Sequence, residues 1–470
     1  MESEITKMSE CNTQAWKRWS VVLLMIGAMA GGYMLLYALS PLQTFLQYEA
    51  GWDLATYSRY SSAESFLNVF CCILLVAGVL TDRLGTRFCG LLSGFLMLAG
   101  GALNFYALTG SFMESQLADW FDTILNFPTS AWNITPFSAG MPASAKLSAI
   151  GFMLFGVGME MAGISASKAT VSWFRGKELA IALGVQLAGS RIIVALALWL
   201  SPRIAMIGNE ASVSRPLGWT LLILIIGICC WIAFGFIDRN RKEEREVSET
   251  VWTPLKRLCR NTAQNRLLWL LALVCVAYYA SVIPFFRYAT AIFQSSMGLQ
   301  ASGAASLIAL LPLASALATP FACMIPDYKG KAIPLMIWGA LFIIICYMMF
   351  AFLLPVIPEL WIAYGGIALL GLSSALVSAG LWPLLPRIAP ASSLGSAYAG
   401  FYWLQAIGLY LTPLLVATFV DDSHVAEPYL YAPAMMLFSA LAAISILGAV
   451  ALSYLNRKEN LGLNLPNKVK

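Results

Sequence analysis

Long apolar runs recur along the whole chain, and they constrain its fold more than any other feature. One runs from about residue 217 to 237, and runs of similar length follow one another to about residue 455. Crossing a hydrocarbon core ~30 Å thick takes ~20 residues of α-helix. Lipid cannot hydrogen-bond exposed backbone groups, so helices are the expected solution. Charged residues make up 11% of the chain, against roughly 25% in soluble domains. We therefore predict an all-α polytopic membrane protein with twelve transmembrane helices.

One polar segment divides these twelve predicted helices into two bundles of six. Residues 239–246 read Arg-Asn-Arg-Lys-Glu-Glu-Arg-Glu, which is too polar to be buried in lipid. The predicted parts are an N-terminal tail (1–18), an N-terminal six-helix bundle (19–237) with an external loop (110–146), a linker (238–266), a C-terminal six-helix bundle (267–455) and a C-terminal tail (456–470). The second span, near 57–81, is expected to be continuous. The external loop is expected to lie on the outer surface as an amphipathic flap or to cover a cavity as a lid.

The distribution of basic residues predicts the orientation. With the N-terminus inside, most of the 29 Lys and Arg residues fall in cytoplasmic tails and loops, and external loops hold only Arg203 and Arg215. This asymmetry places both termini in the cytoplasm. The net charge of +5 thus reports topology, and we expect no nucleic-acid partner. The short N-terminal tail has no acidic dileucine signal, so we predict a plasma membrane or a bacterial inner membrane.

A short glycine-containing loop is predicted between the second and third spans. It reads Gly78-Val-Leu-Thr-Asp82-Arg83-Leu-Gly85-Thr-Arg87 and partly recurs between spans 8 and 9 as Asp327, Gly330 and Lys331. Glycine permits the tight turn, and an aspartate can cap a helix and pair with nearby cations. Such contacts predict a loop that latches one conformation of the protein and releases it in another.

This loop resembles the signature motif of the major facilitator superfamily. The resemblance implies two related six-helix bundles around a central cavity and transport by rocker-switch alternating access.

A narrower resemblance extends over most of the chain. It rests on Gly158-Met-Glu160, on Val171-Ser-Trp173-Phe174 with Gly176-Lys177-Glu178-Leu179, on Gly184-Val-Gln186-Leu187 with Arg191, and on Tyr278-Tyr279, Leu381-Trp382-Pro383 and Leu394-Gly395. These segments are similar to the branch of the superfamily that contains the lysosomal dipeptide uniporter. That resemblance implies a dipeptide cargo that Glu160 and Arg191 contact. Glu64, Arg287 and Ala406 depart from the pattern of the branch.

Two opposite charges are predicted at similar depth in consecutive antiparallel spans. Glu160 lies 14 residues before the turn at Phe174 and Arg191 lies 17 after it, roughly 21 Å and 26 Å along a helix. Charged side chains inside a membrane are costly and are functional candidates by default. Arg191 can bind a carboxylate through two hydrogen bonds. Glu160 can bind an ammonium group, carry a proton or pair with Arg191, and a permanent ion pair between the two is the structural alternative.

Other residues extend the candidate set. Arg59 is expected at the outer surface, with Glu64 about a turn and a half deeper, where it lines a vestibule or carries a proton. Arg287 follows Pro284 near the outer end of its span and is expected either to extend toward lipid head groups or to line the same vestibule. The remaining substrate-binding candidates are aromatic or amide side chains: Tyr33, Tyr37, Tyr278, Tyr279, Trp382, Trp403 and Gln405.

We predict a secondary transporter of short peptides, as a uniporter or as a symporter that uses Glu160 or Glu64 for protons. The alternatives are a carrier of small organic anions and a receptor or accessory membrane subunit without transport. No motif indicates an enzyme, a metal site or a cofactor. The expected partners are the peptide, the lipid bilayer and, as a candidate coupling ion, the proton; the chain is expected to act as a monomer.

Overall fold

The computed structural model describes residues 2–128, 134–174, 179–208, 211–239, 263–388, 394–421 and 429–465. Helices account for nearly all of its regular structure, and the described ranges contain no β-strand. Eleven helices are long and apolar enough to cross a membrane, and the bent pair Leu54–Phe70 with Ile73–Thr81 makes twelve if it is counted as one span. The protein is therefore a multi-span α-helical membrane protein.

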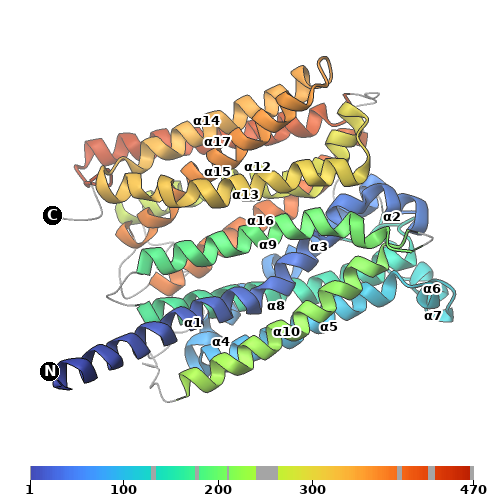
Figure 1. Ribbon diagram of the computed structural model, residues 1–470. Helices are drawn as coiled ribbons and strands as arrows, with labels where there is room; N and C mark the ends of the chain where they lie inside the picture. The colour runs from blue at the N-terminus through green and yellow to red at the C-terminus, as the bar shows by residue number, and fades with distance from the viewer. Residues whose placement is uncertain are drawn as a thin grey trace.

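The helices form two stacked bundles, and both chain ends lie at the same end of the stack (Figure 1). We call this the terminal end and the opposite one the far end. The first bundle contains α1 (Glu2–Ala38), η1 (Ser40–Leu42), α2 (Gln43–Ala50), α3 (Leu54–Phe70), α4 (Ile73–Leu84), α5 (Thr86–Ala107), α6 (Gly110–Met113), α7 (Gln116–Thr123), α8 (Ala143–Phe174), α9 (Leu179–Ala205) and α10 (Ser214–Asp238). The second contains α12 (Ala263–Met297), α13 (Ala301–Tyr328), α14 (Ala332–Met348), the π-helical turn η2 (Met349–Leu353), α15 (Leu360–Ile388), α16 (Leu394–Asp421) and α17 (Ala432–Lys458).

Small residues let the helices of each bundle approach closely. A Cβ atom added to Gly100 of α5 would lie 2.5 Å from the carbonyl oxygen of Gly151 in α8. In turn, a Cβ atom on Gly151 would lie 2.7 Å from the carbonyl oxygen of Gly100. Such close crossings replace the hydrophobic driving force that lipid does not provide between helices.

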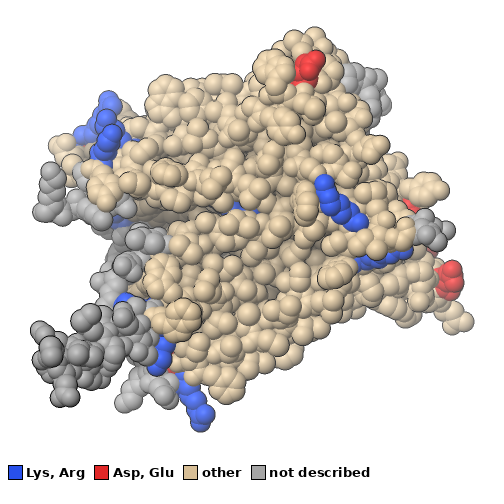
Figure 2. All heavy atoms as spheres, in the orientation of Figure 1, with Lys and Arg blue, Asp and Glu red and all other residues tan. Residues whose placement is uncertain are grey.

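The two bundles meet along two pairs of helices. In one pair α9 packs on α13, and in the other α3 packs on α16. On the outside of this assembly, the broad middle of the visible face carries almost no charge, and Lys and Arg lie toward the two ends (Figure 2). An apolar belt between charged ends is the surface expected of a protein solvated by lipid.

The second span is broken, whereas we expected a continuous helix over 57–81. The helix axis bends by 62° between α3 and α4. Cys72 takes a left-handed backbone conformation with φ of 51° at this point. The carbonyl oxygen of Val69, just before the break, accepts a hydrogen bond from the Trp403 indole at 3.1 Å. Because Trp403 belongs to α16, the break is also a contact between the bundles.

The segment between α5 and α8 is anchored more firmly than a surface flap. Lys146 is only 1% exposed, and its ammonium group donates hydrogen bonds to the carbonyl oxygens of Phe121, Asp122 and Ile124 and to the side chain of Asn126. Phe137 and Met141 of the same segment are buried in the main core. Lys146, at the predicted end of the loop, belongs instead to the first turns of α8.

Candidate functional site

Glu160 and Arg191 lie in two consecutive long helices of the N-terminal bundle, α8 and α9. Both side chains are partly exposed, and Tyr33 of α1 is within electrostatic range of both of them. Within the described residues no ion pair joins Glu160 to Arg191. The alternative of a permanent ion pair between α8 and α9 is therefore wrong for this conformation.

Arg191 instead crosses the interface between the bundles. Its guanidinium donates to the backbone oxygen of Ser315 at 3.1 Å, to the hydroxyl of Thr319 and to the hydroxyl of Ser378 at 3.3 Å. All three acceptors are neutral oxygens on α13 and α15. These hydroxyl residues were not among the predicted candidates, although the spacing of four between Ser315 and Thr319 puts both on one helix face.

Tyr278 adds to this network from α12. Its hydroxyl lies 3.0 Å from the carbonyl oxygen of Ser374 and 3.3 Å from the hydroxyl of Ser378. Because Ser378 also bonds Arg191, the predicted candidates Tyr278 and Arg191 share one partner. They form a polar contact between the bundles at mid-depth.

Three aromatic residues of the C-terminal bundle lie together beside Tyr278. The Trp382 indole donates to the Tyr279 hydroxyl at 2.9 Å. Trp382 also packs on Tyr402, with ring centroids 5.6 Å apart. Tyr279 and Trp382, both predicted, thus share a cluster with Tyr402, which the sequence analysis did not single out. All three are partly exposed.

Glu64 and Arg287 form an ion pair between the bundles. Arg287 Nη2 lies 2.7 Å from Glu64 Oε2, and the two residues are 3% and 4% exposed. The prediction that Arg287 extends toward lipid head groups is wrong, because Glu64 draws its guanidinium inward, away from lipid. Neither residue lines an open vestibule here, since the interface around them is closed.

The remaining predicted candidates have structural partners. The guanidinium of Arg59 donates to the carbonyl oxygen of Thr135 at 3.1 Å. The buried Tyr37 packs edge-on against Phe286 at 5.9 Å. Gln405, partly exposed on α16, lies 4.0 Å from the sulfur of Cys275.

The predicted switch loops are both at the terminal end. Gly85 has φ of 89° between α4 and α5, and a Cβ atom on Gly78 would lie 3.7 Å from Ala399 of α16. Arg87 pairs with Asp238 at 2.7 Å, and the Trp173 indole donates to the same carboxylate. The side chains of Asp82, Arg83 and Asp327 lie outside the described part of the chain.

In the C-terminal bundle, residues 463–465 pack on the related turn at Gly330 and Lys331. The amide of Lys331 donates to the backbone oxygen of Asn464 at 3.0 Å, beside Gly330 with φ of 70°. The side-chain oxygen of Asn464 accepts from the amide of Ile333, and Arg387 donates to the backbone oxygens of Leu463 and Leu465. The two related loops therefore have unrelated partners.

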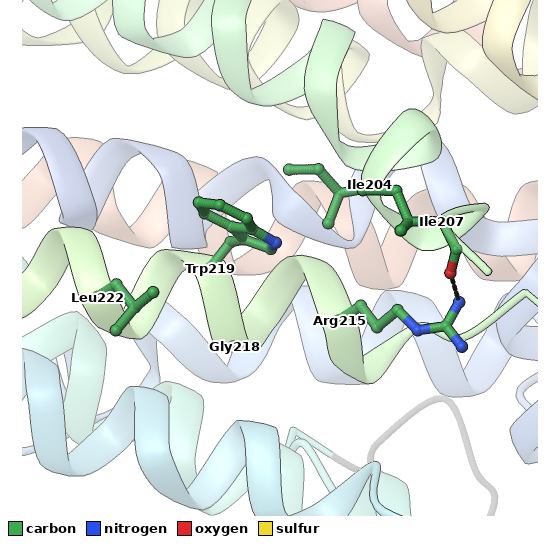
Figure 3. Close-up of a pocket in the computed structure, with 6 residues that line it drawn as sticks. All are labelled: Ile204, Ile207, Arg215, Gly218, Trp219 and Leu222. Carbon is green, nitrogen blue, oxygen red and sulfur yellow. Dashed lines mark hydrogen bonds between the residues drawn. The ribbon is translucent and has the colours of Figure 1, made fainter.

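A pocket with a volume of about 260 Å³ lies elsewhere, between the far ends of α9 and α10. It is lined by Ile204, Ile207, Arg215, Gly218, Trp219 and Leu222, and Arg215 donates to the carbonyl oxygen of Ile207 beside it (Figure 3). None of the predicted site residues lines this pocket. The candidate site is thus the interface between the bundles, around Glu160 and Arg191.

Comparisons with known proteins agree with this architecture. The sequence profile of the Major Facilitator Superfamily matches residues 123–413. The lysosomal dipeptide transporter MFSD1 of Homo sapiens is 28% identical over 332 residues, which cover 68% of this chain and 67% of the relative. The protein of the same name from Danio rerio is 27% identical over 344 residues and 70% of each chain.

Two solved structures share the fold. A D-xylose-proton symporter superposes with a TM-score of 0.65 at 14% identity, over 92% of this chain and 97% of its own. A bacterial homologue of the human drug peptide transporters PepT1 and PepT2 superposes with a TM-score of 0.65 at 15% identity, over 95% and 99%. At these identities the likeness concerns the fold alone.

Proposed function

This chain belongs to the major facilitator superfamily, and on that premise we propose that it is a secondary transporter that carries dipeptides across a membrane. The observation that carries this proposal is the pair Glu160 and Arg191, two opposite charges at mid-depth that do not pair with each other. A dipeptide is a zwitterion, so its two charged ends complement them. The names of the curated relatives agree with this cargo.

Arg191 is the proposed partner of the peptide carboxylate. A guanidinium binds a carboxylate through two parallel hydrogen bonds, and charge-assisted bonds are about twice as strong as neutral ones. The oxygens that now accept from Arg191 are neutral. An incoming carboxylate therefore displaces weaker acceptors.

Glu160 is the proposed partner of the peptide ammonium group. No hydrogen bond from another described residue occupies its carboxylate. A charge at this depth without a partner is costly, and a bound ammonium removes that cost. Glu160 thus selects cargo with a free amino terminus.

The aromatic cluster of Tyr279, Trp382 and Tyr402 is the proposed contact for the peptide side chains. Aromatic rings offer a large apolar area, and their hydroxyl and indole groups keep polar contacts. Many different side chains can pack on such a surface. We infer a carrier that is strict about the peptide termini and tolerant of the side chains.

Transport is proposed to proceed by alternating access between the two bundles. In this conformation the hydrogen bonds that join the bundles gather toward the far end, which is therefore closed. Both termini are proposed to face the cytoplasm, as the basic residues predict. We propose a plasma membrane or a bacterial inner membrane as the location, although the relatives are named as lysosomal transporters. Transport is proposed to be uniport or symport with protons carried by Glu160 or Glu64.

The test is uptake of a labelled dipeptide into proteoliposomes by the purified protein and by Glu160→Gln and Arg191→Gln. Losing a hydrogen bond to a charged group removes about 1.5–3 kcal/mol, so each variant is expected to lose roughly ten- to hundred-fold in kcat/KM. The matched control is Arg215→Gln, which removes a far-end charge that hydrogen-bonds to the backbone oxygens of Ala205 and Ile207 in its own bundle, and it is expected to transport normally.

Modified peptides separate the two roles and the rival functions. An N-acetylated dipeptide is expected to be rejected by the unaltered protein but no further disfavoured by Glu160→Gln, and a C-amidated one to behave likewise with Arg191→Gln. Competition by monocarboxylates at the dipeptide's own concentration would indicate an organic-anion carrier instead. Binding without any flux would indicate a receptor or an accessory subunit.

A further inference from the structure

Glu64 and Arg287 lie one helical turn nearer the far end than Glu160. Glu64 of α3 packs on Gly156 of α8, where an added Cβ atom would lie 2.0 Å from the carbonyl oxygen of Glu64 and 3.1 Å from its Cγ atom. Gly156 precedes Glu160 by four residues, which is ~6 Å along a helix. The ion pair therefore lies on the path between the far end and the proposed site.

The surroundings of this pair form the closed part of the interface. The backbone oxygen of Arg287 accepts hydrogen bonds from Ser40, Gln43 and Tyr57 of the N-terminal bundle, and its guanidinium also donates to the backbone oxygen of Ser61. The far end cannot open without separating these groups. Arg287, from the C-terminal bundle, is the centre of this contact.

We propose that Glu64 and Arg287 form a second, outer binding site for the zwitterionic peptide, which exists only while the bundles are separated at the far end. This inference rests on the proposed function. In that state the carboxylate of Glu64 faces the entering ammonium group, and the guanidinium of Arg287 faces the entering carboxylate. When the peptide leaves this site, the two residues pair with each other and the far end closes.

The chemistry of the pair fits such an exchange. Each residue carries the charge that one end of a zwitterion needs, and the two come from opposite bundles, so a bound peptide replaces the contact between them. Arg287 Nε is buried and has no hydrogen-bond partner among the described residues, so the guanidinium has a donor left for a second carboxylate oxygen. A bidentate carboxylate would use that donor.

The two carboxylates are placed for transfer between the sites. Glu64 and Glu160 lie within electrostatic range of each other. An extended dipeptide spans at most ~7 Å, which is comparable with the single turn that separates the two levels. The ammonium group can therefore pass from Glu64 to Glu160 while the carboxylate passes from Arg287 to Arg191.

The buried ion pair also suits repeated opening. Removing two charges from water costs about as much as their attraction returns, so a buried pair adds little net stability over two solvated charges. Neutral side chains of similar volume can replace such a pair without loss of closure. Closure and peptide capture can accordingly be separated by substitution.

The experiment measures dipeptide KM from each side, in proteoliposomes that hold the protein in one orientation, for the double variant Glu64→Gln/Arg287→Met. An outer site predicts that the KM for loading from the far side rises about tenfold or more while the KM for loading from the terminal side stays within about twofold. Far-end closure is followed in parallel by labelling of Ser58→Cys with an impermeant maleimide, quantified at that residue by mass spectrometry. Ser58 is fully buried there and accepts a hydrogen bond from Tyr288.

The matched control is Tyr288→Phe, which removes that bond between the bundles without removing a charge. It is expected to leave both KM values unchanged. If the double variant does not assemble, Glu64→Asp keeps the charge but retracts it by one methylene, and it must still raise the far-side KM selectively.

If the far-side KM stays within about twofold of that of the unaltered protein in a variant whose far end still closes, the outer site is overturned and the proposed function is left intact. Absence of dipeptide uptake by the unaltered protein would overturn the proposed function and the outer site together. A far-side KM that rises in Tyr288→Phe as much as in the double variant would also overturn the outer site. Loss of any contact between the bundles would then be enough to raise the KM.

Discussion

Arg191 and Arg287 cross the same interface in opposite directions, and they differ in what they meet on the other side. Arg191 leaves the N-terminal bundle and meets neutral oxygens of Ser315, Thr319 and Ser378. Arg287 leaves the C-terminal bundle and meets the carboxylate of Glu64 at 2.7 Å. The first guanidinium is partly exposed, whereas the second is buried.

The difference shows how one residue type can serve two purposes in one interface. A guanidinium held by neutral oxygens gives them up readily to a stronger, charged acceptor. A guanidinium already paired with a buried carboxylate is satisfied in the closed conformation and does not take a further acceptor. Arg191 is therefore ready for cargo in this conformation, and Arg287 becomes ready only when the far end opens.

The largest expected effect comes from removing Arg287 alone. Arg287→Met leaves the carboxylate of Glu64 buried without its partner, which costs about 3–5 kcal/mol in the closed conformation. Labelling at Ser58→Cys is expected to rise by a factor of a hundred or more, and a second change, Glu64→Gln, is expected to reverse most of it. Unchanged labelling would show that the pair does not hold the far end closed.

A smaller effect is expected at Gly156, whose missing side chain lets α8 approach the backbone of Glu64 closely. Gly156→Ala places a methyl group 2.0 Å from the carbonyl oxygen of Glu64, and such overpacking typically costs about 1–3 kcal/mol. The midpoint of thermal unfolding in detergent is expected to fall. The control is Gly163→Ala in the same helix, which has open space around it; equal losses in both variants would refute the packing argument.

Removing one neutral acceptor of Arg191 tests whether the present partners of Arg191 compete with the peptide carboxylate. Thr319→Val removes one neutral acceptor without touching the ionic groups, so the peptide carboxylate has one competitor fewer. A net hydrogen bond of about 1 kcal/mol corresponds to a KM lowered by about fivefold. The control is Thr412→Val, whose hydroxyl donates to the carbonyl oxygen of Gly408 in its own helix. A raised KM would mean that Thr319 positions Arg191 instead of competing for it.

The smallest effect is expected in the aromatic cluster. Trp382→Phe keeps a ring but loses the hydrogen bond to the Tyr279 hydroxyl, which is worth about 1 kcal/mol or less. The KM for dipeptides with large side chains is expected to rise two- to fivefold, with little change for a glycine dipeptide. The exposed Trp338 of α14 supplies the control, Trp338→Phe, and an equal response of both peptides would exclude a side-chain pocket here.

Hydropathy predicted the membrane helices, because their length and composition follow from the thickness of the bilayer. It could not predict the break at Cys71 and Cys72, where no glycine or proline interrupts the apolar run. The hydroxyl partners of Arg191 could not be predicted from the sequence either. Serine and threonine are common in membrane helices, and most of them bond their own backbone.

Spacing along a helix predicted depth but left rotation undetermined. Glu160 and Arg191 were placed at similar depth, yet depth alone does not say whether two side chains point at each other. Arg287 and Glu64 come from spans far apart in the sequence, and only the docking of the two bundles on each other shows that their side chains meet. The linker predicted at 238–266 lies largely outside the described residues, so the predicted domain boundaries stay predictions.

The contact of Asn464 with Lys331 and Ile333 means that the C-terminal bundle is not complete when its last long helix ends at Lys458. Arg387 and the Gly330 turn depend on six or seven further residues for their hydrogen bonds. An affinity tag or a fluorescent reporter joined directly after the last helix would therefore displace a structural element. Such a fusion belongs at the N-terminus or behind a spacer that begins after Leu465.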